Sequence, residues 1–210
     1  MTPYPILVVT AVPAEADAVR AGLAPEEIVV EAVGVGPAAA AAGTARLLAG
    51  REYRAVLSVG IAGGFPDRAP VGSLVVATRS IAADLGAESP GGFLPIEELG
   101  FGSSVVETDP RLVKALRAAL PEAVCGDVLT LATVTGTAGT AARLAARFPA
   151  AVAEAMEGHG VAVAAAGAGV PFAELRAISN PVGPRDRAAW RLGDAFAALR
   201  AAGPALDALP

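Results

Sequence analysis

Short apolar runs rich in β-branched residues alternate along this chain with segments rich in alanine, leucine and arginine. We interpret the apolar runs as strands and the alanine-rich segments as helices. Strands are expected at 6–10, 27–35, 55–59, 72–80, 128–133 and 172–179, and helices at 14–22, 37–49, 110–119, 140–148, 151–169 and 187–199. The alternation predicts an α/β layered fold, and the continuously apolar central strands predict helices on both faces of the sheet.

Size and charge narrow the class of protein. A length of 210 residues is compatible with one domain, 1–210, that buries a substantial core. No apolar stretch approaches the ~18–20 residues of a membrane helix, so we expect no membrane partner. The net charge of −5 argues against a nucleic-acid partner. The N-terminus has no basic region before its apolar run, so we expect a first strand there rather than a signal peptide.

Cysteine and histidine are too scarce for several kinds of site. Cys125 is the only cysteine and His159 the only histidine, so we expect no disulfide, no metal site and no nucleophilic triad. We interpret Cys125 as a buried structural residue and His159 as a helix-surface or packing residue. We also interpret Trp190 and Phe196 as core positions of the last helix. A cytoplasmic protein without metal or cofactor is the expected class.

Two glycine-rich segments follow predicted strands. In the segment Gly60-Ile61-Ala62-Gly63-Gly64, the glycines allow backbone amides to approach a ligand closely, and we favour a binding role over a tight turn. Gly34-Val35-Gly36-Pro37 lacks the third glycine of a dinucleotide fingerprint, so a tight turn is favoured there. Residues 84–108 read as a loop, which serves either as a plain connection or as an active-site lid.

Two glutamates stand where acid–base chemistry or ligand binding is possible. Glu15 follows the first strand; on chemistry alone we favour a helix-starting surface residue over a general acid or base. Glu157 lies in an alanine-rich segment that we read as a buried helix, where a carboxylate needs a partner. Without a basic residue near it in sequence, a ligand hydroxyl is the favoured partner, and Arg176 is the structural alternative. The strand ending at Asn180 aims a second polar group toward the same region.

At this point the chain resembles the nucleoside phosphorylase and nucleosidase superfamily over nearly its whole length. The first strand with Glu15 is similar to the catalytic element of methylthioadenosine/adenosylhomocysteine nucleosidases. Segment 58–64 resembles the family's glycine-rich strand end, 155–157 its Met-Glu ribose-binding element, and 171–180 its base-binding strand. The resemblance implies a three-layer sandwich with a central mixed β-sheet flanked by helices.

The resemblance also implies roles for individual residues. Glu15 would polarise the attacking water, Glu157 would hold the ribose hydroxyls above Met156, and Asn180 would act at the base. The walls around the sugar and base would be formed by Ile61, Ala62, Gly63, Val134 and Thr135.

One departure from the adenine-specific nucleosidases concerns the base. Those enzymes end the base-binding strand in Ser-Asp, whereas this chain has Asn180. An amide carries both a donor and an acceptor, so we expect a 6-oxopurine rather than adenine. The loop after the first strand also lacks the phosphate-binding arginine of the phosphorylases, which favours hydrolysis. A phosphorylase, an adenine-type nucleosidase and a non-catalytic nucleoside-binding domain remain the alternatives.

With Glu15 and Asn180 in these places, the chain resembles the futalosine hydrolase subfamily. The implied reaction is hydrolysis of futalosine to hypoxanthine in menaquinone biosynthesis, by a homo-oligomer built from dimers. The substrate would carry an aromatic carboxylate, for which the candidate partners are Arg79, Arg185, Arg187 and residues of a neighbouring subunit.

Overall fold

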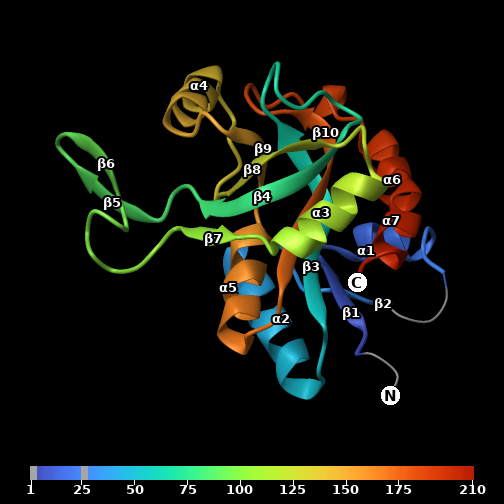
Figure 1. Cartoon of the computed structure of the whole chain (residues 1–210). Helices are drawn as coiled ribbons and strands as arrows, with labels where there is room; N and C mark the ends of the chain where they lie inside the picture. The colour runs from blue at the N-terminus through green and yellow to red at the C-terminus, as the bar shows by residue number, and fades with distance from the viewer. Residues whose placement is uncertain (1–3, 25–27) are drawn as a thin grey trace.

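The computed structural model describes residues 4–24 and 28–210 and contains a mixed β-sheet with helices around it (Figure 1). The strands are β1 (Ile6–Thr10), β2 (Ile28–Ala32), β3 (Ala55–Gly64), β4 (Leu74–Ala82), β5 (Gly86–Ser89), β6 (Gly92–Pro95), β7 (Val105–Glu107), β8 (Val124–Thr130), β9 (Ala151–Ala155) and β10 (Phe172–Pro181). The helices are α1 (Pro13–Arg20), α2 (Pro37–Gly50), α3 (Pro110–Ala119), α4 (Ala138–Arg147), α5 (Gly158–Ala168), α6 (Leu192–Ala201) and α7 (Gly203–Asp207), with a short 3₁₀ helix, η1 (Arg187–Ala189).

The main sheet has the strand order β10-β4-β8-β9-β3-β1-β2, with β7 paired to β4. Strand β3 also pairs with β10, so β3, β10, β4, β8 and β9 form a closed ring. Pairs β1–β3, β3–β10 and β8–β9 are parallel, whereas β4–β10 and β3–β9 are antiparallel. The predicted α/β class with a mixed sheet is therefore confirmed, and the ring makes part of this sheet barrel-like.

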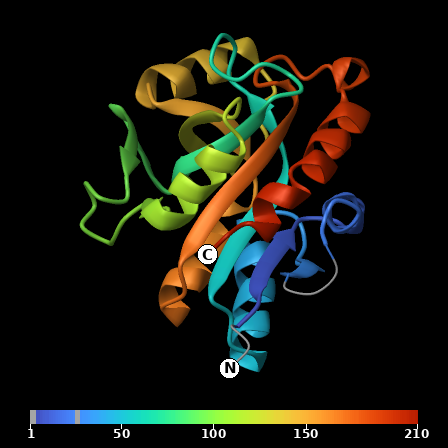
Figure 2. The same ribbon diagram turned by 45° about the vertical axis from the view of Figure 1, so that its right-hand side comes forward.

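Helices cover the sheet on two sides, as the apolar central strands predicted. In β1, Ile6 and Val8 pack in a cluster with α1 and α6, whereas Leu7 and Val9 pack with α2 and α5. Figure 2 shows α1 and α6 on the opposite side of β1 and β3 from α2. A further cluster draws on every strand of the ring and on no helix, so its mostly small side chains fill the inside of the ring. This packing explains the many alanines of the strands.

The prediction of one long helix at 151–169 is wrong. Residues 151–155 form β9, which pairs with β8 and β3, and only residues 158–168 form a helix, α5. Alanine favours helix by well under 1 kcal/mol per residue, so burial in the sheet overrides its propensity here. Glu157 consequently lies at the junction between β9 and α5 rather than inside a helix.

The prediction of a loop at 84–108 is also wrong in part. Strands β5 and β6 form a hairpin with Ser89 opposite Gly92, and β7 follows it. Figure 1 shows this hairpin projecting from the body of the protein at the left. We call residues 84–104 the arm.

Other boundaries differ from the expectation by a few residues. The last predicted helix, 187–199, is η1 followed by α6, and the expected strand at 128–133 is β8, which begins at Val124. The predicted start of the second strand at residue 27 lies outside the described residues, as do residues 1–3 of the N-terminal segment. Among the helices of the described residues, none is both long and apolar enough to cross a membrane.

Candidate active site

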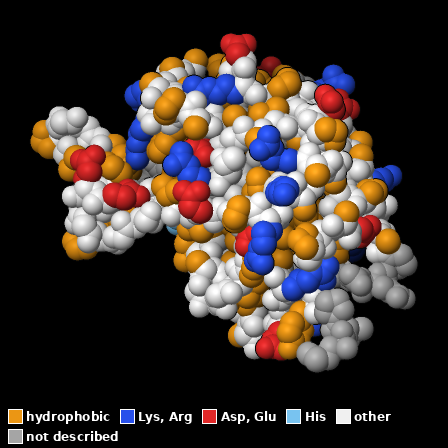
Figure 3. All heavy atoms as spheres, viewed as in Figure 1, with side chains coloured by type: hydrophobic (Ala, Val, Ile, Leu, Met, Phe, Trp, Pro, Cys, Tyr) orange, Lys and Arg blue, Asp and Glu red, His pale blue; other side chains and the backbone are white. Residues whose placement is uncertain are grey.

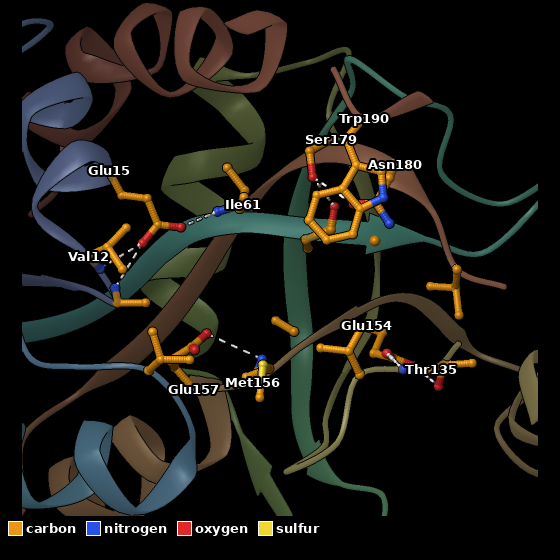
Figure 4. Close-up of a pocket in the computed structure, with 17 residues that line it drawn as sticks. Val12, Glu15, Ile61, Thr135, Glu154, Met156, Glu157, Ser179, Asn180 and Trp190 are labelled. Atoms are coloured by element: carbon orange, nitrogen blue, oxygen red, sulfur yellow. Dashed lines mark hydrogen bonds between the residues drawn. The ribbon is translucent and has the colours of Figure 1, made fainter. Parts of the chain in front are cut away.

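A cavity of about 210 Å³ opens beside the last residues of β1, β3, β9 and β10 (Figure 4). Side chains and loops at the carboxyl ends of parallel strands commonly form binding sites in α/β proteins. Every residue proposed from the sequence for the water, the sugar or the base lies in its wall. The lining residues are Ala11, Val12, Glu15, Val35, Ile61, Ala62, Gly63, Val134, Thr135, Glu154, Ala155, Met156, Glu157, Ser179, Asn180, Val182 and Trp190.

Glu15 is buried in the first turn of α1 and faces the cavity. One carboxylate oxygen, Oε2, accepts hydrogen bonds from the amides of Ala11 and Val12 at 2.9 and 3.2 Å. The other, Oε1, accepts from the amide of Ile61 at 2.8 Å. Glu15 is therefore not the surface residue that chemistry alone favoured: it caps α1 and also reaches across to β3.

The protonated form of Glu15 is more favoured in this buried environment than that of a glutamate side chain exposed to water. Burial raises the pKa of this carboxyl group above its ordinary value, while the Ile61 amide and the Arg176 guanidinium act in the opposite direction. Gly60 leaves the space that both groups need, since a Cβ atom there would lie 2.7 Å from Glu15 Oε1 and 2.8 Å from Arg176 Nη1.

Glu157 precedes α5 and connects several segments around the cavity. Its Oε1 accepts a hydrogen bond from the amide of Gly36 at 3.1 Å, and its Oε2 accepts from the amide of Met156 at 3.2 Å. Arg176 Nη1 lies 3.6 Å from Oε2. The structural alternative for Glu157 is thus present, because Arg176 partners it from β10. Its position in the cavity wall leaves the carboxylate accessible to a ligand as well.

Arg176 is one of the largest fully buried side chains of the protein. Its Nε donates to Glu174 Oε1 at 2.9 Å, and its Nη2 donates to Ser58 Oγ at 2.7 Å. Burial raises the pKa of Glu174, and the nearby Arg176 opposes this shift. The guanidinium does not line the cavity; from behind its wall it compensates the negative charges of Glu174 and Glu157.

Asn180 lies at the other end of the cavity from Glu15 and Glu157 (Figure 4). Its Oδ1 accepts a hydrogen bond from Ser179 Oγ at 2.8 Å, and its Nδ2 donates to the carbonyl of Pro181 at 3.0 Å. Thr135 and Val134 line the same end, next to a buried carboxylate, Glu154.

Several lining residues were missed from the sequence. Trp190 does not belong to the core of the last helix, because it follows η1 and lines the cavity. Glu154 was hidden by the incorrect helix at 151–169, because the alanines around it favour a helix and gave no local signal of a strand end. Gly36 has the positive φ of the expected turn, at 89°, and its amide also binds Glu157.

The remaining candidates lie elsewhere. His159 is buried in α5, which excludes the surface interpretation, and Cys125 is only partly buried. Phe196 packs against the core as expected. Within the part of the chain that the structure describes, no cluster of three or more His, Cys, Asp or Glu residues could hold a metal ion.

The three candidate arginines differ in what they contact. Arg79 forms two hydrogen bonds with Asp127, at 2.9 and 2.5 Å. The guanidinium carbons of Arg185 and Arg187 lie 6.0 and 5.9 Å from the centre of the Trp190 ring. Neither arginine forms an ion pair with any described residue.

Comparison with known proteins places this chain in a family. The sequence model of the phosphorylase superfamily matches residues 6–205. A futalosine hydrolase of Streptomyces coelicolor is 54% identical over 92% of this chain and 91% of its own length. A futalosine hydrolase of Acidothermus cellulolyticus is 49% identical, over 93% and 90%.

A solved structure shares the fold at much lower identity. It is the 5'-methylthioadenosine/S-adenosylhomocysteine nucleosidase of Neisseria meningitidis in complex with methylthio-immucillin-A. The TM-score is 0.85 at 20% identity, over 98% of this chain and 100% of the other.

Proposed function

This chain belongs to the futalosine hydrolase family of the phosphorylase superfamily, and we propose that it hydrolyses the N-glycosidic bond of futalosine and releases hypoxanthine. On the basis of the subfamily resemblance, we assign the reaction to menaquinone biosynthesis by the futalosine pathway. The reaction adds water across the bond between the ribose C1' and the purine N9, so the sugar gains a hydroxyl group and the base gains a proton.

We propose that Glu15 orients the attacking water and takes its proton. Its three backbone donors hold the carboxylate in one orientation, which limits the reorganisation that the reaction requires. As the bond to N9 breaks, the sugar gains oxocarbenium character and the base gains negative charge. The Asn180 amide is placed to donate a hydrogen bond to the departing base, because the Pro181 carbonyl uses one of its two N–H hydrogens and the other is left for a ligand.

Glu157 and Met156 form the sugar end of the proposed site. The Glu157 carboxylate accepts hydrogen bonds from the ribose hydroxyls, and its negative charge stabilises the developing positive charge on the sugar. Met156 packs beneath the ribose. The apolar surfaces of Ile61, Ala62 and Val134, together with Gly63 and Thr135, enclose the sugar and the base.

The charge of the cavity wall supports water rather than phosphate as the nucleophile. Among the described residues that line the cavity, the charged ones are Glu15, Glu154 and Glu157, and none is lysine or arginine. The wall therefore offers a phosphate ion no lysine or arginine side chain to pair with. This observation, together with the identity to futalosine hydrolases, is the main support for hydrolysis.

The test compares hypoxanthine or adenine release from futalosine, inosine and methylthioadenosine, with and without phosphate. We expect futalosine to be cleaved fastest, at a rate that does not depend on phosphate. Cleavage only with added phosphate would identify a phosphorylase, and faster cleavage of methylthioadenosine would identify an adenine-type nucleosidase. Tight binding without turnover would indicate a sensor domain.

For the aromatic carboxylate of the substrate, we propose Arg185 and Arg187 as partners. Both guanidinium groups lie beside Trp190, which lines the cavity, and both are free to pair with an anion. Arg79 is a weaker candidate because Asp127 occupies it.

We also propose a homo-oligomer, in which the arm contributes to contacts between subunits. The arm exposes the apolar side chains of Leu85, Phe93 and Phe101, and Phe101 is 79% exposed. Figure 3 shows hydrophobic atoms on the part of the protein that projects at the left. Exposed aromatic side chains on a projecting segment favour burial against another protein surface.

A further inference from the structure

Three positions on neighbouring strands form a row across the base end of the cavity. Gly63 of β3 pairs with Asn180 of β10 on one side and with Glu154 of β9 on the other. Adjacent strands lie ~4.8 Å apart, so the backbones of Glu154 and Asn180 are separated by about 10 Å. Both side chains line the cavity, and Gly63 contributes no side chain between them. We call the part of the cavity between these two polar side chains the slot. A Cβ atom on Gly63 would lie 3.3 Å from Asn180 Nδ2 and 3.0 Å from Val182 Cγ2, so these two side chains border the slot over Gly63.

Glu154 is held in this slot by a single neighbour. Its Oε1 accepts a hydrogen bond from the amide of Thr135 at 2.7 Å, and its Oε2 accepts from Thr135 Oγ1 at 2.5 Å. Figure 4 shows both contacts at the lower right of the cavity, below Asn180. The Thr135 amide is thereby occupied and cannot donate to a ligand, while each carboxylate oxygen keeps a lone pair free.

The two walls of the slot differ in hydrogen-bonding character. On the Glu154 side, the free groups are acceptors. On the Asn180 side, the amide nitrogen donates one hydrogen to the Pro181 carbonyl and keeps its second hydrogen for a ligand, so this side supplies a donor. Burial raises the pKa of Glu154, and the two Thr135 donors oppose that shift and favour the ionised, acceptor form.

This arrangement matches one class of purine. A 6-oxopurine has acceptors at N7 and O6 and a hydrogen on N1, whereas adenine has a bare acceptor at N1. We infer that Glu154 is a specificity-determining residue whose carboxylate accepts the N1–H hydrogen of a 6-oxopurine base while Asn180 donates on the N7 side. The inference rests on the proposed function for the base class. It adds a reason to exclude adenine that does not depend on Asn180, because a carboxylate repels the N1 lone pair.

The experiment measures binding of free bases, which needs no turnover. Titration calorimetry compares hypoxanthine, 1-methylhypoxanthine and adenine with the unaltered protein, the Glu154→Gln variant and a control variant, Glu31→Gln. Glu31 is an exposed glutamate on β2. We expect the unaltered protein and the control to bind hypoxanthine at least about tenfold more tightly than either other base. Glu154→Gln should reduce or abolish this preference, because the amide adds a donor.

Three outcomes would overturn the inference. One is equal binding of hypoxanthine and 1-methylhypoxanthine by the unaltered protein, a comparison that does not require the variant to fold. Another is an unchanged hypoxanthine-to-adenine preference in a folded Glu154→Gln protein. The third is a preference of the unaltered protein for adenine that the Glu154→Gln variant loses. If futalosine is not hydrolysed but the base preference depends on Glu154, the proposed function fails and the inference stands.

Discussion

At the scale of single residues, three glutamates face one cavity, and their partners separate their roles. Glu15 is bound by amides from two segments, Glu157 by amides and an arginine, and Glu154 by one threonine. Backbone donors cannot rotate away, so they fix the orientation of a carboxylate more strictly than flexible side chains do. Glu15 is therefore the best positioned of the three to direct a water molecule.

Replacing Glu15 by glutamine should lower kcat by a factor on the order of 10²–10⁴, because an amide cannot take the proton of water. Binding of hypoxanthine should change little, since Glu15 lies at the opposite end of the cavity from Asn180. Steady-state kinetics and calorimetry measure the two quantities. Asp17→Asn is the matched control, because Asp17 is exposed on the same helix and should leave kcat unchanged. Unaltered turnover in Glu15→Gln would remove Glu15 from the mechanism.

The raised pKa of Glu15 predicts how activity depends on pH. The carboxylate form is the active one, so kcat/KM should fall as pH decreases through the pKa of the free enzyme. Because burial raises that pKa above 4.5, the acid limb should lie above the value of a solvated glutamate. A pH profile of kcat/KM for futalosine tests this. Full activity down to pH 4.5 in a folded protein would contradict the assignment.

At the scale of elements, the start of α5 is fitted closely to β10. A Cβ atom on Gly158 would lie 2.3 Å from Glu174 Oε1, and Arg176 holds that carboxylate in place. The backbone of α5 can therefore approach the buried ion pair only because the residue after Glu157 is glycine. This approach also sets the position of Glu157 in the cavity.

Gly158→Ala should destabilise the protein by about 1–3 kcal/mol, because the added methyl group overpacks a buried site. It should also weaken substrate binding by displacing Glu157. On the same helix, Gly167 has open space around its Cβ position, so Gly167→Ala should stabilise by about 0.5–1 kcal/mol. Urea unfolding measures both variants. Equal effects of the two substitutions would show that helix propensity, rather than the contact with Glu174, governs this site.

The segment that carries η1 should determine how the aromatic carboxylate of the substrate is recognised. Removing both guanidinium groups, in Arg185→Ala/Arg187→Ala, should raise KM for futalosine by about tenfold, because a charge-assisted hydrogen bond is lost. KM for inosine, which lacks the carboxylate, should not change. Arg200→Ala on α6 serves as the control, since this exposed arginine lies outside the cavity wall. Equal increases for both substrates would exclude carboxylate recognition by this pair.

At the scale of the whole molecule, the arm projects from the body of the protein and exposes apolar side chains that no other segment covers among the described residues. If it contributes to contacts between subunits, Phe101→Glu should shift the protein toward a smaller species, because a charge replaces an exposed aromatic ring. Light scattering after size exclusion measures the mass. Val71→Glu is the control, since Val71 is also an exposed apolar residue but lies outside the arm. An unchanged mass for Phe101→Glu would remove this residue from the interface.

The ring of strands explains why the sequence revealed some parts of the site and not others. Residues that follow a β-branched run, such as Glu15 and Asn180, could be placed near a strand end from periodicity alone. Glu154 could not, because the alanines around it have strong helix propensity and only pairing with β8 and β3 makes the segment a strand. Trp190 lies beyond a strand end, and its place depends on how the segment after Asn180 folds over the cavity.

The sequence by itself determined the α/β class, the order of most elements and the family, because these depend on local periodicity and on short motifs. The tertiary structure alone decided that Glu154 joins Glu15 and Glu157 in the cavity, and which of the possible partners each carboxylate has. Glu15 with Ile61, and Glu157 with Gly36 and Arg176, are contacts between distant segments, and strand pairing through Gly63 places Glu154 opposite Asn180. Such contacts arise from strand pairing and close packing, which no local pattern in the chain encodes.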